Sequence, residues 1–352
     1  MARILIVAPN WIGDTLLARP LFARLRQRLP GAVLHVVAPA WTAPVLARMP
    51  EIDEVIETDF RHGELRLKDR WRLGRGLRQR GYQEAVVLPN SFKSALVPFF
   101  ADIPLRAGFA GEWRHGLLNI VHKLDPSKLP LMADRYAQLA EKPGEPVAPR
   151  LHVQRLQVDE ANLLITVSRL GLNRGKPIAV FCPGAEYGPA KRWPAAHFAE
   201  LARQLAARGM AVWLMGSAKD REVAEEISSL SGRAALNLCG RTDLASAIDL
   251  MSLARWVVAN DSGLMHVAAA LGRPLIALYG SSSPDHTPPL AQSPAQAQEL
   301  VHIVKLEGVE CSPCFQRECP LGHFRCMREL SPELVYNLAR ATPVSSPPPP
   351  SR

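Results

Sequence analysis

The chain has 352 residues, of which 47% are hydrophobic and 21% charged, and a formal net charge of +9 at pH 7. This length is enough for two domains, and the composition excludes an intrinsically disordered or fibrous protein. No uncharged apolar run approaches the roughly 18 residues that a membrane-spanning helix needs, so we expect a cytoplasmic protein.

The first predicted element is the apolar run RILIVAP at residues 3–9. It could pass for the core of a signal peptide, but it leads into the string WIGD, with Asp14 where a small-residue cleavage site belongs. We therefore interpret the run as a buried strand. Residues 16–29 carry apolar side chains at helical spacing and predict a helix.

Short apolar runs alternate with helical patterns in two series. In the first series, strands are expected at 3–9, 33–39, 84–89 and 106–109. In the second, helices such as 195–208 and 244–254 separate strands expected at 177–185, 211–217, 235–239, 256–260 and 274–281. Because apolar strands that alternate with helices are typical of parallel sheets covered on both faces, the chain is expected to have an α/β fold.

Two such series predict two Rossmann-like domains that face each other across a cleft. The proline-rich segment 142–149 and the turn at 173–176 place the boundary near residue 172. The expected domains are therefore 1–172 and 173–340. The tail 341–352, with its SSPPPPS run, is expected to be polyproline or disordered.

Basic residues are concentrated in the first half, where residues 1–150 hold 22 Lys/Arg against 15 Asp/Glu. A basic surface attracts anionic partners such as nucleic acid, phospholipid or a phosphorylated substrate, and a solvated helix face is the alternative. The densest stretch, 61–80, has two acids and eight bases: Arg61, Arg66, Lys68, Arg70, Arg72, Arg75, Arg78 and Arg80.

The loop at residues 10–15, NWIGDT, comes directly after the first predicted strand. Ligands of open α/β sheets bind beyond the carboxyl ends of strands, so this loop is expected to contact a ligand. It lacks the GxGxxG pattern of dinucleotide-binding proteins. Asp14 is its candidate functional side chain, and an N-cap of a helix that begins around Leu16 is the alternative interpretation.

The second half opens with PGA at 183–185, followed by KRWP at 191–194. Gly184 ends a predicted strand, and Lys191 just precedes a predicted helix, where its ammonium group is placed to meet a phosphate. A solvated surface lysine is the alternative.

The strongest signal is ANDSGLMHVAAA at 259–270, where a strand ends in small polar residues and a helix begins at once. Ser262 and Gly263, with the free N–H groups of the first helical turn, make an anion site without a Walker-type lysine. Asp261 is placed to bond sugar hydroxyls, and His266 lies one turn inside the helix. An aspartate N-cap and a core histidine are the alternatives. Another turn-rich loop, YGSSSPDHTPP at 279–289, also follows a strand.

A CxxC motif with two further cysteines, Cys311, Cys314, Cys319 and Cys326, resembles a zinc knuckle. The later spacings are irregular, however, a zinc ribbon normally has two CxxC pairs, and His323 offers a competing ligand. We therefore favour reduced structural thiols over metal binding and assign no metal ligand. Cys182 and Cys239 end predicted strands and are expected in the core.

Together these strings resemble the ADP-heptose:lipopolysaccharide heptosyltransferases, an inverting family with the GT-B fold of two facing Rossmann domains. The resemblance runs from APNWIGD through VVAPAW and LARMPEIDEV to NDSGLMHVAAALGRPLIALYGSSSPDHTPPL, and only the tail after about residue 340 falls outside it. Two stretches, LPNSFKSALVPFF and CSPCFQRECPLGHFRCM, are more similar to heptosyltransferase II than to heptosyltransferase I.

The resemblance implies a role for each candidate residue. Asp14 is implied as the general base, since an alcohol is a poor nucleophile until a carboxylate takes its proton. Lys191 is implied at the diphosphate that leaves as ADP, and the helix start at 262–263 would add N–H donors. Asp261 would hold heptose hydroxyls, with His266 in the same pocket, and Asp220 is the candidate for the ribose. The implied donor-binding residues are Gly184, Asp220, Asp261, Ser262, Gly263 and His266.

The resemblance also implies the partners of the protein. The donor would be ADP-heptose, and the acceptor an anionic lipopolysaccharide inner core that already bears one heptose. No cofactor or metal is implied, since the DxD motif of metal-dependent glycosyltransferases is absent from the sequence. The basic first half then favours transient docking on the cytoplasmic face of the inner membrane, at about 1 kcal/mol per base.

Two other functions compete with this one. Heptosyltransferase I, acting on Kdo-lipid A, is the nearest enzyme. A basic nucleic-acid-binding protein with a zinc knuckle comes from a different class. Against the latter, the basic stretch lies far in sequence from the cysteines, and no aromatic-rich RNA-binding strand is present, so no nucleic-acid partner is expected.

Overall fold

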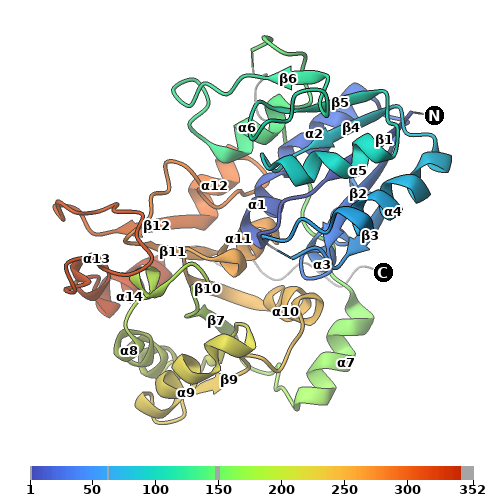
Figure 1. Ribbon diagram of the computed structural model, residues 1–352. Coiled ribbons are helices and arrows are strands. Elements are labelled where there is room, and N and C mark those ends of the chain that lie inside the picture. Colours follow the sequence, from blue (N-terminus) through green and yellow to red (C-terminus); the bar gives the residue numbers. More distant parts are fainter. Residues whose placement is uncertain (1, 62, 147–150, 342–352) are drawn as a thin grey trace. The chain divides into compact units, whose positions relative to one another are not determined.

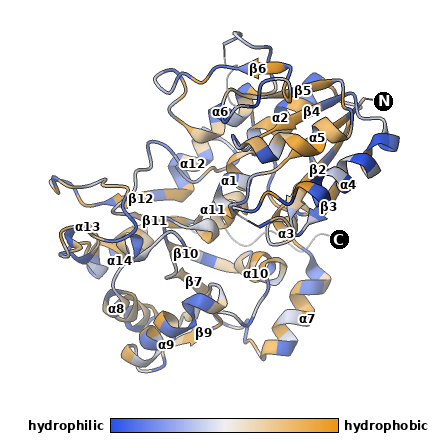
Figure 2. Cartoon of the chain, in the orientation of Figure 1, coloured by the Kyte–Doolittle hydropathy of each residue, from blue (hydrophilic) through white to orange (hydrophobic). Residues whose placement is uncertain are grey.

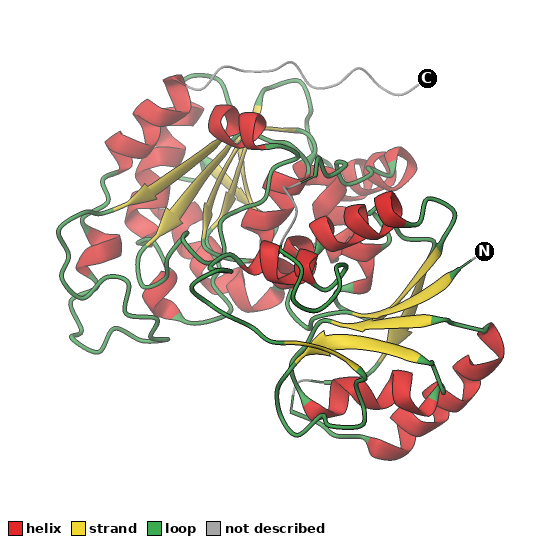
Figure 3. Ribbon diagram, turned by 90° about the horizontal axis from the view of Figure 1, so that it is seen from above, coloured by secondary structure: helices red, strands yellow, loops and turns green. Residues whose placement is uncertain are grey.

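The computed structural model describes residues 2–61, 63–146 and 151–341, and it divides into two compact units (Figure 1). The first unit comprises Met1–Leu156 with Asp285–Thr287, and the second comprises Gln157–Pro284 with Pro288–Arg352. Each unit is built on one six-stranded sheet. Helices cover both faces of each sheet (Figure 3), which confirms the α/β prediction.

The sheet of the first unit is parallel throughout, in the order β3-β2-β1-β4-β5-β6. The order reverses between β1 and β4, which is the switch point of a Rossmann sheet. The four expected strands are present, whereas the two edge strands β3 and β6 were missed because half-exposed residues dilute their apolar pattern. The strands are β1 (Arg3–Val7), β2 (Val33–Pro39), β3 (Glu54–Thr58), β4 (Glu84–Val87), β5 (Leu105–Phe109) and β6 (Ile120–His122).

Short helices connect these strands. The single helix expected at 16–29 is wrong: the structure has two, interrupted at Ala18, because Pro20, in the first turn of the second helix, has no N–H to donate to the preceding turn. The helices are α1 (Ile12–Leu17), α2 (Arg19–Arg28), α3 (Ala43–Leu46), α4 (Leu67–Leu77), α5 (Leu96–Phe100) and α6 (Met132–Gln138), with 3₁₀ turns η1 (Arg78–Arg80) and η2 (Phe92–Ala95).

The apolar strands form the core of this unit. Leu5 and Val37 of the sheet pack in one buried cluster with Leu77 of α4. Gly74 allows α4 to approach α5 closely, since a Cβ there would collide with Phe100. Figure 2 shows apolar strands and a largely hydrophilic α4. Within the described ranges, no helix is both long and apolar enough to cross a bilayer.

The second sheet is also parallel and has the order β12-β11-β10-β7-β8-β9. Counted from β7, this is the strand order of the first unit, with the switch point between β7 and β10. All five expected strands are present, and the missed β12 is again an edge strand. The strands are β7 (Ile178–Cys182), β8 (Ala211–Leu214), β9 (Ala235–Asn237), β10 (Ala254–Asn260), β11 (Leu275–Tyr279) and β12 (Val301–Lys305).

The helices of the second unit pack around a large aromatic core. The buried Trp193 ring meets Phe198 of α8 edge to face, with centroids 4.8 Å apart, and its indole N–H donates to the Leu330 carbonyl. The helices are α7 (Glu160–Leu170), α8 (Ala195–Ala206), α9 (Arg221–Leu230), α10 (Leu244–Met251), α11 (Gly263–Ala270), α12 (Pro294–Leu300), α13 (Arg325–Arg328) and α14 (Pro332–Ala341), with 3₁₀ turns η3 (Pro189–Lys191) and η4 (Ala218–Asp220).

Helix α7 belongs to the second unit, so the units divide at residues 156–157 and not near residue 172. Asp249 of α10 is completely buried. It accepts hydrogen bonds from the backbone N–H of Asp159 (2.9 Å) and from the side chain of Asn162 (2.7 Å). These bonds hold the start of α7 against α10. The tail expected after residue 340 lies outside the described residues, apart from Ala341 at the end of α14.

A short segment from later in the chain, Asp285–Thr287, belongs to the first unit. The backbone N–H of Met132, at the start of α6, donates to the His286 carbonyl (3.0 Å). The ring Nδ1 of His286 is 2.7 Å from the Pro130 carbonyl. These contacts account for the assignment of Asp285–Thr287 to the first unit.

Candidate functional site

Two loops of the second unit meet where β7 and β10 end, at its switch point. The side chain of Asn260, the last residue of β10, is completely buried. Its Nδ2 donates to the Pro183 carbonyl (2.8 Å), and its Oδ1 accepts from the backbone N–H of Trp193 (3.1 Å). One amide therefore fastens both ends of the loop that follows β7, and this loop carries Lys191 to the side of Asp261.

Lys191 and Asp261 form a largely buried ion pair. The Lys191 Nζ lies 2.5 Å from Oδ2 of Asp261, and the same oxygen accepts from the Ser282 hydroxyl (2.6 Å). The side chains are 16% and 7% exposed, so water and salt screen the pair only weakly. The surface-lysine interpretation is therefore wrong. The ammonium group of Lys191 lies at the switch point, in an ion pair with Asp261.

The first turn of α11 has no side-chain cap. Its N-cap residue is Ser262, whose side chain makes no capping hydrogen bond to the backbone N–H groups of this turn. Asp261 precedes this turn and is engaged with Lys191, so the aspartate N-cap interpretation is wrong. The N–H groups of the first turn, which begins at Gly263, have no partner within the helix and add a partial positive charge beside Lys191. Together these groups favour an anionic ligand.

His266 is buried beside the ion pair. Its Nδ1 has no hydrogen-bond partner among the described residues. Burial lowers the pKa of His266 to about 4; the Asp261 charge acts in the opposite direction, and the Lys191 charge lowers the pKa further. The ring is therefore neutral at physiological pH and has one nitrogen to offer a ligand.

We predict that His266 destabilises the protein in mild acid. Its pKa is about 4 in the folded protein and about 6.5 in an unfolded chain. Because the unfolded chain binds the proton first, stability falls as the pH drops from about 6.5 to about 4, by up to about 3 kcal/mol. Urea unfolding of His266→Asn should show a smaller loss over this range. An equal loss in the variant and the wild type would contradict the prediction.

Gly184 and Asp220 contact each other near the ends of β7 and β8. A Cβ at Gly184 would collide with the Asp220 carboxylate, so this approach requires glycine. Oδ2 of Asp220 accepts from both the backbone N–H (2.9 Å) and the hydroxyl (2.8 Å) of Ser217, which closes a capping box at η4. The capping box uses Oδ2 of Asp220, and the ribose contact of Asp220 stays a prediction.

The C-terminal cysteine group lies in the chain between β12 and the end of α13. His323 Nε2 is 4.0 Å from the Cys311 sulfur. In the ranges that the structure describes, no three His, Cys, Asp or Glu side chains are placed to hold a metal ion. Cys182 and Cys239 are buried, as expected, and burial raises the pKa of Cys239 to about 12. The remaining thiols are also free: Cys311, Cys314, Cys319 and Cys326.

In the first unit, the loop after β1 lies at the switch point with β4. Helix α1 begins at Ile12 and not around Leu16, so Asp14 lies inside its first turn and is not its N-cap. The helix-cap interpretation of Asp14 is therefore wrong. Burial raises the pKa of Tyr136 on α6, and the charge of the half-buried Asp14 raises that pKa further. The Asp14 carboxylate therefore lies near the Tyr136 phenol.

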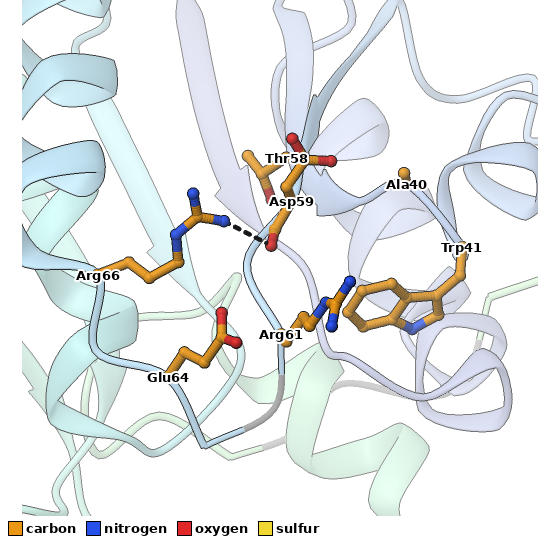
Figure 4. A pocket seen from close by; sticks show the side chains of 7 residues that line it. All are labelled: Ala40, Trp41, Thr58, Asp59, Arg61, Glu64 and Arg66. Atoms are coloured by element: carbon orange, nitrogen blue, oxygen red, sulfur yellow. Dashed lines mark hydrogen bonds between the residues drawn. The ribbon is translucent and has the colours of Figure 1, made fainter.

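A cavity of about 600 Å³ lies in the first unit beyond the ends of β2 and β3 (Figure 4). The indole N–H of Trp41 donates to the Asn10 carbonyl (2.8 Å), which connects the cavity wall to the β1 loop. Arg66 donates to the Asp59 carbonyl (3.0 Å). An aromatic ring beside guanidinium and carboxylate groups suits an anionic ligand with hydroxyl groups. The lining residues are Ala40, Trp41, Thr58, Asp59, Arg61, Glu64 and Arg66.

The basic stretch 61–80 is only partly exposed. Arg70 is buried: its Nε donates to the Leu65 carbonyl (2.7 Å), and its guanidinium lies 4.1 Å from the centroid of the Phe60 ring. Arg80 is paired with Glu54 at 2.6 Å. Bases and apolar side chains are exposed together on and just before α4, and we call this surface the α4 face: Leu65, Leu67, Lys68, Trp71, Arg72 and Arg75.

Two residues at this switch point were not among the candidate site residues. A polar residue that ends an apolar strand is a local signal, and it could have indicated Asn260. The loop that holds Ser282 was noted because it follows a strand, but no local pattern distinguishes Ser282 within it, since its partner Asp261 lies 21 residues away.

Each unit thus has the Rossmann strand order and a ligand-type loop at its switch point. The switch point of the second unit has Lys191 and the start of α11, which lacks a side-chain cap. The switch point of the first unit has the half-buried Asp14. Two units with Rossmann strand order, each with a ligand-type loop at its switch point, are the plan of the GT-B class of two-domain glycosyltransferases.

Comparison with known proteins gives the family. Residues 70–325 match glycosyltransferase family 9 (heptosyltransferase). The chain is 49% identical to lipopolysaccharide heptosyltransferase 2 of Escherichia coli strain K12 over 82% of this chain and 86% of that one. The solved structure of E. coli ADP-heptose LPS heptosyltransferase II has a TM-score of 0.84 and 42% identity, with 97% and 98% coverage. Lipopolysaccharide heptosyltransferase 1 of Pseudomonas aeruginosa is 28% identical over 97% and 95%. The chain belongs to glycosyltransferase family 9.

Proposed function

We propose that this glycosyltransferase transfers heptose from ADP-heptose to the first heptose of the lipopolysaccharide inner core, with inversion at the anomeric carbon. This is the heptosyltransferase II reaction. The observation that carries the proposal is the 49% identity to a heptosyltransferase 2, against 28% to a heptosyltransferase 1. Heptosyltransferase I activity and nucleic-acid binding are accordingly not favoured.

The test is turnover of ADP-heptose on two defined acceptors, one without heptose and one with a single heptose. Transfer should occur only to the second. Transfer to the heptose-free acceptor would assign the heptosyltransferase I reaction, and turnover of a different nucleotide-sugar in place of ADP-heptose would overturn the donor.

In the proposed reaction, Asp14 takes the proton of the acceptor hydroxyl as that oxygen bonds to the anomeric carbon. The bond from this carbon to the diphosphate oxygen breaks on the opposite side, and ADP leaves with the electron pair. Attack opposite the leaving group inverts the anomeric centre. The position of Asp14 at the β1 switch point, in the first turn of α1, supports this role.

We predict that Asp14→Asn keeps the fold and the affinity for ADP but lowers turnover by roughly 100-fold or more, the usual range for a lost general base. Steady-state kinetics and calorimetric ADP binding would measure both effects. Asp102→Asn is a matched control, because Asp102 is exposed and has a positive φ that asparagine also adopts. Near-normal turnover of Asp14→Asn would exclude Asp14 as the base.

On the donor side, Lys191 and the first turn of α11 stabilise the charge that develops on the leaving diphosphate. Ser262 and Gly263 supply that turn. Asp261, which is held by Lys191, bonds hydroxyls of the heptose, and the neutral His266 lines the same pocket. This proposal assigns no metal ion to the reaction, and Lys191 and the N–H groups of α11 are the protein groups that it places at the diphosphate.

We predict that Lys191→Ala reduces kcat/KM for the donor by about 10- to 100-fold, because one charge-assisted contact of about 1.5–3 kcal/mol is lost. Lys219→Ala is the control, since Lys219 is exposed in the same unit and paired with Glu186. If Lys191→Ala instead raised the acceptor KM and left donor kinetics intact, Lys191 would belong to the acceptor side.

The acceptor is anionic and lipid-linked, and the α4 face provides a surface for docking on its membrane. Trp71 and Leu67 are each about half exposed, and Lys68, Arg72 and Arg75 are exposed around them. Aromatic and leucine side chains with flanking bases are the composition of interfacial helices that bind anionic lipids.

We predict that replacing Lys68, Arg72 and Arg75 with glutamine weakens binding to anionic vesicles by roughly 100-fold at low salt, at about 1 kcal/mol per base. The salt dependence should flatten, because exposed charges are screened over about 8–10 Å at ordinary salt. Turnover on a lipid-free core oligosaccharide should hardly change. Arg70 and Arg78 are left intact, since they bond the Leu65 and Phe100 carbonyls.

The matched control removes the same charge from the second unit, through glutamine at the exposed residues Arg174, Lys176 and Arg208. Vesicle binding that falls equally in both triple variants would show a general charge effect. Binding that survives the α4 replacements would leave the α4 face as solvated surface only.

A further inference from the structure

The chain that follows β12 is bonded to the loop after β7, which carries Lys191, and to the loop after β11. The backbone N–H of Phe315 donates to the Ser281 carbonyl (2.6 Å), and the Phe315 carbonyl accepts from the Tyr187 hydroxyl (2.8 Å). Two residues on, the Arg317 carbonyl accepts from the backbone N–H of Ala190 (3.0 Å), inside η3. We call residues 306–324 the cysteine loop. The backbone of the cysteine loop is therefore bonded to the loop that carries Lys191.

The position of Arg317 is set by close packing. A Cβ at Gly188 would collide with the backbone carbonyl of Arg317, so only glycine allows this approach. Phe315 has a φ of +54°, a left-handed conformation that is rare for phenylalanine. Such strain persists where the surroundings impose it, and it concentrates at functional sites. The backbone N–H and carbonyl of Phe315 are the groups that bond Ser281 and Tyr187.

Arg317 and Lys191 share one aromatic ring. The Lys191 Nζ lies 5.0 Å from the centroid of the Tyr187 ring, and the Arg317 Cζ lies 5.3 Å from it. The two cations are therefore within about 10 Å of each other, which is close to the Debye length at ordinary salt. The ring attracts both cations but does not cancel their repulsion.

The carboxylates around this ring are already engaged with other cations. Asp261 pairs with Lys191, and Glu186 pairs with Lys219. Arg317 is exposed and forms no ion pair within the part of the chain that the structure describes. Within the described residues, Arg317 is therefore a cation without a carboxylate partner, on a residue whose backbone carbonyl is bonded to η3.

We propose that Arg317 binds the β-phosphate of the ADP-sugar and stabilises ADP as it leaves. The inference rests on the function proposed above, since it takes the donor to be a nucleoside diphosphate sugar. Lys191 alone is insufficient, because Asp261 compensates its charge and a diphosphate carries two or more negative charges. A guanidinium also binds phosphate oxygens bidentately, which an ammonium cannot do.

The test compares ADP and AMP as ligands of the wild type, R317Q and R328Q by titration calorimetry. R317Q should weaken ADP binding by about 10- to 100-fold, the range for a lost charge-assisted contact, and leave AMP binding nearly unchanged. R328Q is the matched control, because Arg328 lies in α13 just after the cysteine loop and packs on the Phe324 ring at 5.4 Å. It should change neither affinity.

Two further variants separate the charge from its position. R317K keeps the charge without the guanidinium fork and should recover only part of the ADP affinity. G188A keeps the arginine but displaces its backbone, so it should weaken ADP binding with AMP binding retained. Thermal melting of each variant establishes that it is folded.

Failure of this inference can be told apart from failure of the proposed function. A wild type that binds neither ADP nor AMP would overturn the proposed function. A wild type that prefers ADP, together with an R317Q variant that has the same preference, would overturn only the role of Arg317. A raised acceptor KM with unchanged ADP affinity in R317Q would also overturn it and assign Arg317 to the acceptor.

Discussion

The loops at the switch point of the second unit depend on the side-chain amide of Asn260. Backbone groups just beyond the carboxyl ends of parallel strands have no ladder partner, so the loops there need another anchor. Asn260 supplies it with both ends of its amide, one on the Pro183 carbonyl and the other on the Trp193 N–H. Leucine would supply neither bond and aspartate only one. A buried group left without its partner costs about 1–3 kcal/mol, so the strand end dictates where the loop lies.

Charge around this anchor is mostly compensated before any ligand arrives. Lys191 is paired with Asp261, and His266 is kept neutral by burial. Under the proposed function, an anionic donor has to compete with Asp261 for Lys191, so its binding requires this ion pair to rearrange. Arg317 lies beside the same Tyr187 ring as Lys191 but comes from a loop far away in sequence.

Features that depend on neighbouring residues could be predicted from the sequence. Contacts between residues far apart in the chain could not. Buried strands such as β1 and β10 are continuous apolar runs, whereas edge strand β3 carries residues such as Glu54 and has no such run. Asp261 was singled out because a topological rule places ligands at strand ends, and the structure pairs it there with Lys191. The Tyr187–Phe315 bond joins residues 128 positions apart, so no local pattern could indicate it. Arg70 shows the reverse case, a base within a basic run that tertiary contacts bury.

The assignment of Asp285–Thr287 to the first unit has a consequence for chimeric enzymes. The chain leaves the second unit after Pro284 and returns at Pro288, so the two units are not consecutive pieces of the gene. A cut at residues 156–157 would give an N-terminal fragment in which Met132 lacks the His286 carbonyl at the start of α6. An exchange of halves between relatives would therefore have to transplant these three residues together with the first 156.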